Sequence, residues 1–175
     1  MATIDLIVLG MLKKEPLSAY DIQKLVEYRN ISKWVKISTP SIYKKVIQLE
    51  GKGLITSHME KEGKMPEKAV YSLTAEGEKE FEKLMLEIAS KPIHLFLDFN
   101  AVIVNLESMS KEKQQDCMDN IESNLKVLKE YIEENIVAKE NIPDIPLTGM
   151  AVLRQQLALV QAIEEWVVSL KDTLR

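Results

Sequence analysis

Apolar residues recur with helical spacing along most of the chain. Between residues 4 and 12 they stand at i, i+3, i+4, i+7 and i+8, which predicts an amphipathic helix that ends before Pro16. Ser18 has an acidic residue, Asp21, three positions later, which is the spacing of a capping box. The apolar residues that follow, Ile22, Leu25 and Val26, predict a second helix.

The stretch TPSIYKKVIQLEGKG at residues 39–53 predicts a third helix with two different faces. Pro40 suits its first position, after a cap at Thr39 or Ser38, because the missing N–H would have no helical partner there. The face expected to point inward is apolar and consists of Ile42, Val46 and Leu49, with Tyr43 and Ile47 at its edge. The opposite face is expected to be polar and consists of Ser41, Lys44, Lys45, Gln48 and Lys52.

Two short strand-like runs follow, LITSHME at 54–60 and AVYSLT at 69–74, and the lysine-rich turn between them predicts a β-hairpin. Thr74 then begins a fourth helix whose first turns are acidic, which suits the helix dipole. The order helix, helix, helix, hairpin, helix is that of a winged helix-turn-helix. We therefore expect a mainly α fold with a small β-hairpin, and we assign the winged helix-turn-helix domain to residues 1–90.

The pattern changes beyond Lys91–Pro92. After an apolar run at 95–107, Ser110 is expected to cap a long helix whose apolar residues have the 3-4-3-4 spacing of a coiled coil. A loop around Pro143 and Pro146 leads to a last helix, at roughly 148–173, that is apolar on two sides. Its first stripe is Met150, Leu153, Leu157 and Val160, and its second is Leu159, Ile163, Trp166 and Leu170.

A helix that is apolar on two sides, in a region with few helices, predicts a second copy of the chain. Residues 91–175 are therefore expected to form a helical, coiled-coil-like dimerisation domain, and the protein a homodimer. The alternative is that the long helix and the 95–107 segment cover both stripes within one chain. The residues expected at the dimer contact are Met118, Ile121, Leu125, Leu128, Ile132, Leu159, Ile163, Trp166 and Leu170.

The net charge of −4 conceals an uneven distribution. Nine basic and four acidic residues lie between Tyr28 and Lys68, a balance of +5, whereas residues 91–175 have nine basic and fourteen acidic residues, a balance of −5. The local field decides where a polyanion binds. The polar face of the third helix is suited to the major groove of double-stranded DNA, where Lys and Gln reach base edges. The hairpin lysines expected at the phosphates are Lys61, Lys64 and Lys68.

Other classes of function have little support in the sequence. His58 and His94 have no neighbours at metal-ligand spacing, and phosphate-binding and nucleophile motifs do not occur, so we expect no metal, no cofactor and no enzyme. No apolar run is long enough for a membrane helix, and the N-terminus does not resemble a signal peptide. The single cysteine, Cys117, is typical of the reducing cytoplasm. A winged helix that binds another protein instead of DNA is the alternative.

Three segments together resemble the PadR family of transcriptional regulators. They are LIVLGMLKKEPLSAYDI (6–22), KISTPSIYKKVIQLEGKGLI (36–55) and AVYSLTAEGEKEF (69–81). They are similar to the family's opening helix pair, its recognition helix and its strand-to-helix junction, although Ala19 stands where the family usually has glycine. The long helical C-terminal part resembles the larger subgroup of the family, whose members append a dimerising helical domain.

The resemblance implies a homodimeric DNA-binding protein, usually a repressor, that binds a palindromic operator and is released by a small aromatic or hydrophobic effector. It places Tyr20 at a phosphate. It implies that the recognition-helix residues are Thr39, Ser41, Tyr43, Lys44, Lys45 and Gln48. The residues that either line an effector cavity or belong to the core are Trp34, Trp166, Met109, Met118 and Met150.

Overall fold

The computed structural model describes residues 2–35, 37, 41–61, 67–143 and 145–174. The chain divides into two compact units, Met1–Ile93 and His94–Arg175, and each is described by itself. Among the described residues, no helix combines the length and the apolar character that crossing a membrane would require.

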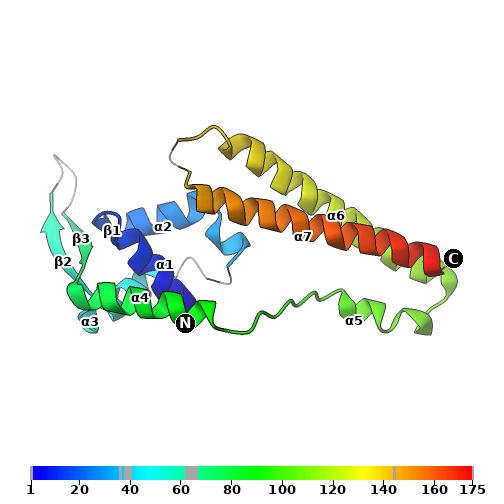
Figure 1. The fold of residues 1–175 in the computed structure, drawn as a ribbon, viewed down its shortest axis with the longest axis horizontal. Coiled ribbons are helices and arrows are strands. Elements are labelled where there is room, and N and C mark those ends of the chain that lie inside the picture. The colour runs from blue at the N-terminus through cyan, green and yellow to red at the C-terminus, as the bar shows by residue number, and fades with distance from the viewer. Residues whose placement is uncertain (1, 36, 38–40, 62–66, 144, 175) are drawn as a thin grey trace. The chain divides into compact units, whose positions relative to one another are not determined.

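The N-terminal unit combines four α-helices with a small antiparallel sheet (Figure 1). The helices are α1 (Ala2–Leu12), α2 (Ala19–Tyr28), α3 (Ser41–Gly51) and α4 (Ala75–Ala89), with a short 3-10 helix, η1 (Ile31–Lys33), after α2. The strands are β1 (Leu17–Ser18), β2 (Ile55–Glu60) and β3 (Lys68–Leu73), in the order β1-β3-β2. The predicted winged-helix fold is confirmed, and we call β2 and β3 the wing.

The strand β1 is the one element of the sheet that the sequence pattern did not predict. It pairs with β3 through Leu17 opposite Tyr71 and Ser18 opposite Val70. Two residues are too few to show the alternation by which a strand is recognised. The pairing ties the start of α2 to the wing.

The helices and the sheet close around one apolar core. The inward stripe predicted for α3 is confirmed, because Ile42, Val46 and Leu49 are all fully buried. They pack with buried residues of the other elements, among them Val8, Leu9, Ile22, Val26 and Ile55. The opposite side of α3 is left outside this core.

The junction between the wing and α4 is held by close backbone contacts. Thr74 caps α4 by accepting a hydrogen bond from the amide of Gly77, and its own hydroxyl donates to the carbonyl of Gly53 at 2.7 Å. Gly53 has φ +72°, which favours glycine in this turn. A Cβ on Gly77 would lie 2.0 Å from the carbonyl oxygen of Leu54. The sequence YSLTAEG therefore needs both its threonine and its glycine.

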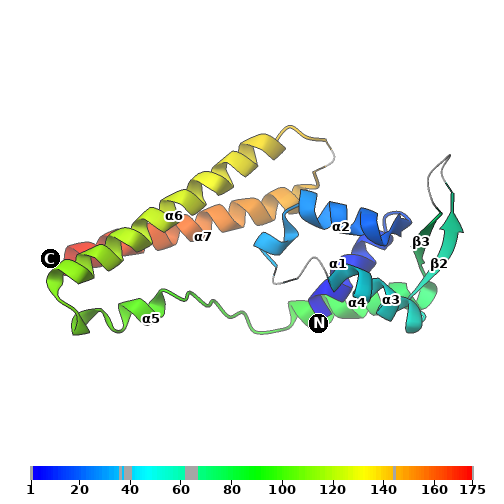
Figure 2. The ribbon, with the colours of Figure 1, turned by 180° about the vertical axis from the view of Figure 1, so that it is seen from behind.

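The C-terminal unit is built on two long helices, α6 (Lys111–Lys139) and α7 (Leu147–Leu174), which lie side by side in both views (Figures 1 and 2). The short elements α5 (Asn100–Ile103) and η2 (Leu106–Ser108) precede them. Ser110 occupies the N-cap position of α6, as predicted, but its side chain makes no capping hydrogen bond. The pair is joined across the helices by Lys129 with Glu164 at 2.7 Å and by Lys171 with Asp119 at 2.6 Å.

Candidate nucleic-acid interface

The exposed side of α3 is a mixed polar and apolar surface. Lys44 and Gln48 are exposed, one turn apart, and Lys52 is exposed just beyond the end of the helix. Tyr43 is also exposed, and Ile47 is 65% exposed, although the sequence pattern placed both at the edge of the buried stripe. We call Tyr43, Lys44, Ile47 and Gln48 the outer face of α3. It exposes an ammonium, an amide, a phenol and an apolar side chain on one side of the helix.

Lys45 does not lie on this outer face, and that part of the prediction is wrong. Its side chain is 9% exposed, and its Nζ lies 2.8 Å from Oδ1 of Asp5 on α1, a side chain that is 15% exposed. Position 45 comes three residues after Ile42 and four before Leu49, so helical spacing places it on their buried side. A buried ammonium needs an opposite charge, and Asp5 supplies it.

Asp5 is a residue that the sequence analysis missed. It is the one charged residue in α1, whose sequence is otherwise ATI–LIVLGML, and a charge in so apolar a helix is a signal of a buried partner. Among the described residues, no donor meets its Oδ1 at hydrogen-bonding angles. The contact with Lys45 is therefore one of charge attraction, and it ties α1 to α3.

The remaining predicted residues of the recognition helix are only partly described. Thr39 lies outside the described residues, and so does Pro40, the expected first helical position. Ser41 is the first residue of α3, but its side chain is not among those described. The roles of Thr39 and Ser41 therefore stay predictions.

Tyr20 is exposed at the first turn of α2, where the resemblance placed a phosphate contact. The Nζ of Lys24 lies 5.4 Å from the centre of its ring, within the range of a cation–π contact. Lys24 was not among the predicted site residues, although it stands four residues after Tyr20 and so on the same side of the helix. A phenol and an ammonium are thus held together at the start of α2, and both suit a phosphate oxygen.

The start of α2 is fixed by the predicted capping box. The hydroxyl of Ser18 accepts from the amide of Asp21 at 3.2 Å and donates to the Asp21 carboxylate at 2.6 Å, while the Ser18 amide donates to the same carboxylate. The hydrogen bond from the Ser18 hydroxyl is the main reason that the pKa of Asp21 is below its ordinary value. The Ser18 amide and the nearby charge of Lys68 lower this pKa further. The cap keeps Tyr20 in its place on the first turn.

The wing carries the predicted lysines in different environments. Lys61 is exposed just after β2, whereas Lys68 at the start of β3 lies 3.6 Å from the Asp21 carboxylate. Lys64 lies outside the described residues. The hydroxyl of Ser57 on β2 donates to Glu50 of α3 at 2.5 Å. The wing is therefore tied to α3 by Ser57 and to α2 by Lys68, which stands near the tip of the hairpin opposite Glu60.

Comparison with known proteins supports this arrangement. The family of PadR-like transcriptional regulators matches residues 8–83, which include α2, α3 and the wing. The N-terminal unit is PadR-like. No curated protein matches the sequence.

Solved structures share the PadR-like fold over almost the whole chain. Bacillus subtilis PadR in complex with operator DNA has a TM-score of 0.84 at 20% identity, with 99% of both chains covered. The same protein in complex with p-coumaric acid has a TM-score of 0.81 at 19% identity, covering 98% of this chain and 94% of that one. The Vibrio cholerae virulence activator AphA has a TM-score of 0.73 at 20% identity, covering 97% and 96%.

The C-terminal unit buries several residues that were predicted at a dimer contact. Met118, Ile121, Leu125 and Ile132 of α6 are buried against α7 of the same chain. Within one chain α7 covers this coiled-coil seam, and the role of these residues at a dimer contact stays a prediction.

The buried stripe of the last helix combines residues of the two predicted stripes. The α7 residues in the core shared with α6 stand at i, i+3, i+6, i+10, i+13 and i+17, and they are Leu157, Val160, Ile163, Val167, Leu170 and Leu174. Ile163 and Leu170 therefore belong to the core within the chain. Phe99, Ile103 and Leu106 pack on the same core, so the 95–107 segment covers part of it, as the intramolecular alternative expected.

Three of the predicted dimer residues remain at the surface. Leu128 of α6 is exposed, and Leu159 and Trp166 of α7 are 41% and 43% exposed. Leu159 and Trp166 are seven residues apart and so lie on the same side of α7. The ring of Trp166 stacks on that of Phe99, with 6.2 Å between the ring centres. Apolar surface thus remains on the outside of both long helices.

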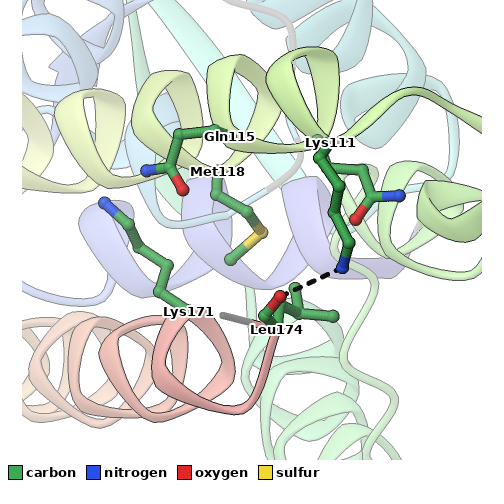
Figure 3. Close-up of a pocket in the computed structure, with 6 residues that line it drawn as sticks. Lys111, Gln115, Met118, Lys171 and Leu174 are labelled. Atoms are coloured by element: carbon green, nitrogen blue, oxygen red, sulfur yellow. Dashed lines mark hydrogen bonds between the residues drawn. The ribbon is translucent and has the colours of Figure 1, made fainter.

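A cavity of about 290 Å³ opens between the first turns of α6 and the end of α7 (Figure 3). Lys111 donates to the carbonyl oxygen of Leu174 at 3.1 Å, and Lys171 donates to Asp119 and Glu122. Both ammonium groups at the cavity are thus engaged within the chain. Of the five residues considered for an effector cavity, Met118 lines this one and the other four do not.

Proposed function

We propose that the protein is a DNA-binding transcriptional regulator that reads an operator with the outer face of α3. The observation that carries this proposal is that Tyr43, Lys44 and Gln48 are exposed together on the third helix of a PadR-like winged helix. An α-helix with such donors fits the major groove. The fold shared with PadR in its operator complex supports this placement.

The contacts outside α3 complete the proposed interface. Tyr20 and Lys24 are suited to a phosphate beside the groove, and Lys61 of the wing is suited to another. Lys45 is left out of the interface, because its ammonium is buried against Asp5. A regulator of this kind binds its DNA in the cytoplasm.

We further propose that the protein acts as a homodimer on a palindromic operator. Two α3 helices would then enter successive major grooves about 34–36 Å apart. The exposed apolar residues Leu128, Leu159 and Trp166 support a contact between two copies of the C-terminal unit. Residues 91–175 are in this proposal the dimerisation domain, and residues 1–90 the DNA-binding domain.

The proposed sense of regulation is repression that a small hydrophobic or aromatic effector relieves. Bacillus subtilis PadR has been crystallised with p-coumaric acid, which supports an effector of this class. Such a ligand acts by binding one dimer geometry better than another. A phenolic acid added to the protein–DNA complex is expected to release the DNA, and an unchanged complex at saturating acid would remove this class of effector.

The proposed DNA binding is tested by titrating the protein onto a fluorescent duplex from just upstream of its own gene, beside a scrambled duplex, at several salt concentrations. We expect the upstream duplex to bind ~10³-fold tighter or more. The affinity should fall steeply with salt, by a slope of about 0.9 for each phosphate contact.

Two variants that remove the same charge sharpen this test. Lys44→Gln removes an ammonium from the outer face of α3 and should weaken specific binding at least ~10-fold. Lys126→Gln removes one from an exposed position of α6 and should leave binding unchanged. Equal, weak binding of both duplexes, or equal effects of the two variants, would overturn the proposal and favour a protein partner.

A further inference from the structure

One apolar side chain stands within the outer face of α3. Ile47 is 65% exposed, while Val46 beside it is fully buried. It follows Lys44 by three residues and precedes Gly51 by four, so it lies in line with both along the helix. Single exposed apolar residues are common on protein surfaces. This one is distinguished by its neighbours, because Lys44 and Gln48 place it in the surface assigned above to the major groove.

The floor of the major groove offers one apolar group to such a side chain. Each base pair presents hydrogen-bond donors and acceptors there, and thymine alone of the four common bases adds a 5-methyl group. An isoleucine has no donor or acceptor, so it can recognise only that methyl. Its β-branched side chain has essentially one preferred χ1 rotamer in a helix, which fixes its methyl groups without much loss of entropy on binding.

The space next to Ile47 is open. A Cβ on Gly51, one turn further along, would meet nothing within 4 Å. The fold therefore does not require a glycine at this position, and the missing side chain leaves room beside Ile47. Lys44, Ile47 and Gln48 are all exposed beside this open space.

We propose that Ile47 is a specificity-determining residue that reads the 5-methyl group of a thymine in each operator half-site. This inference rests on the proposed function, because it takes the outer face of α3 to be the surface that enters the groove.

The test removes the methyl group from the DNA and leaves the protein unaltered. A duplex that the full-length protein selects from a randomised pool is made again with each thymine replaced in turn by deoxyuridine, which keeps every hydrogen-bonding group. At one position in each half-site we expect the wild-type protein to bind about fourfold more weakly, and about 15-fold with both replaced. A fourfold loss corresponds to ~0.8 kcal/mol, the value of one buried methylene.

The matching protein variants decide whether Ile47 is responsible. Ile47→Ala should bind the thymine and deoxyuridine duplexes equally. Because Ile47 is exposed, we expect this variant to fold like the wild type. Lys44→Gln should bind both duplexes more weakly and keep the fourfold preference for thymine.

Three outcomes would overturn the inference. If the wild-type protein selects a sequence but is indifferent to every deoxyuridine, the outer face binds DNA without this contact, and the proposed function stands. If Ile47→Ala keeps the preference, another residue reads the methyl group. If no sequence is selected at all, the proposed function fails together with the inference.

Discussion

The two units bury their apolar residues in different ways. In the N-terminal unit, four helices and a sheet close around a single core, and α3 is fully buried along one stripe. In the C-terminal unit, two long helices cover one another along one stripe only, and both keep large apolar residues such as Leu128, Leu159 and Val168 at the surface. The first unit closes a core between helices and sheet, whereas the two long helices of the second pack on one side only and keep apolar residues on another side.

The largest expected effect concerns the tight junction of the N-terminal unit. Gly77→Ala places a Cβ 2.0 Å from the backbone oxygen of Leu54. This clash involves a backbone atom, so it cannot be relieved by a change of side-chain rotamer. We expect the free energy of unfolding to fall by about 3 kcal/mol or more, at the upper end of overpacked cores. Chemical denaturation measures it.

Gly51→Ala is the matched control, because its Cβ meets nothing within 4 Å. It should stabilise the helix by up to about 1 kcal/mol. Equal stability of the two alanine variants would contradict the close packing of the N-terminal unit.

The next effect concerns the charge pair inside that unit. Lys45→Met leaves Asp5 charged without its partner, and we expect a loss of about 3 kcal/mol in the free energy of unfolding. The double variant Asp5→Leu with Lys45→Met should return to within about 1 kcal/mol of the wild type, because an apolar pair can replace a buried ion pair.

The exposed neighbour gives the control for this cycle. Lys44→Met should change stability by no more than about 0.5 kcal/mol. If Lys45→Met were as mild as Lys44→Met, the buried position of Lys45 would be wrong, and its predicted role at the DNA would return.

The third effect would show whether the C-terminal unit needs a second copy. Leu128→Lys together with Leu159→Lys puts two charges on the exposed apolar surface. Because each buried leucine contributes roughly 1.5–3 kcal/mol, we expect dimer dissociation to become ~10²-fold easier or more. Sedimentation velocity over a range of concentrations measures it.

Ser123→Lys together with Gln161→Lys adds the same charge at exposed polar positions on other sides of the same helices and should leave the dimer intact. A wild-type protein that sediments as a monomer at every concentration would remove the contrast between the two units altogether.

The smallest effect concerns the cap of α2. Ser18→Ala removes the hydroxyl that binds Asp21, and we expect a loss of ~1 kcal/mol at neutral pH. The folded protein lowers the pKa of Asp21 below about 3.8, so this contribution is complete above that value and disappears as the pH falls through the lowered pKa. The difference between the two proteins should therefore shrink in acid to the part that comes from the hydroxyl accepting the Asp21 amide, and a difference that grew toward low pH would contradict the cap.

The sequence predicted what depends on neighbours along the chain and missed what depends on neighbours in space. The spacing of Ile42, Val46 and Leu49 was enough to give the buried side of α3, and Ser18 and Asp21 were enough to give the cap of α2. The edges of these faces were harder. Lys45 lies at the border of the buried stripe, and it is buried because Asp5, forty residues earlier on another helix, neutralises its charge.

The same limit explains the C-terminal unit. Two apolar stripes were visible on the last helix, but helical spacing alone could not tell which one the long helix covers. The packing assigns Ile163 and Leu170 to the inside and leaves Leu159 and Trp166 outside. The strand β1 was missed because only its pairing with Tyr71 and Val70 makes it a strand.

The contacts along the wing have a mechanical consequence. Ser57 joins it to α3, Lys68 joins it to α2, and Thr74 locks its exit to the turn at Gly53. These three contacts restrict the swing of the hairpin relative to α2 and α3. Under the proposed function, we therefore expect an effector that weakens DNA binding to move the whole N-terminal unit and not the wing alone.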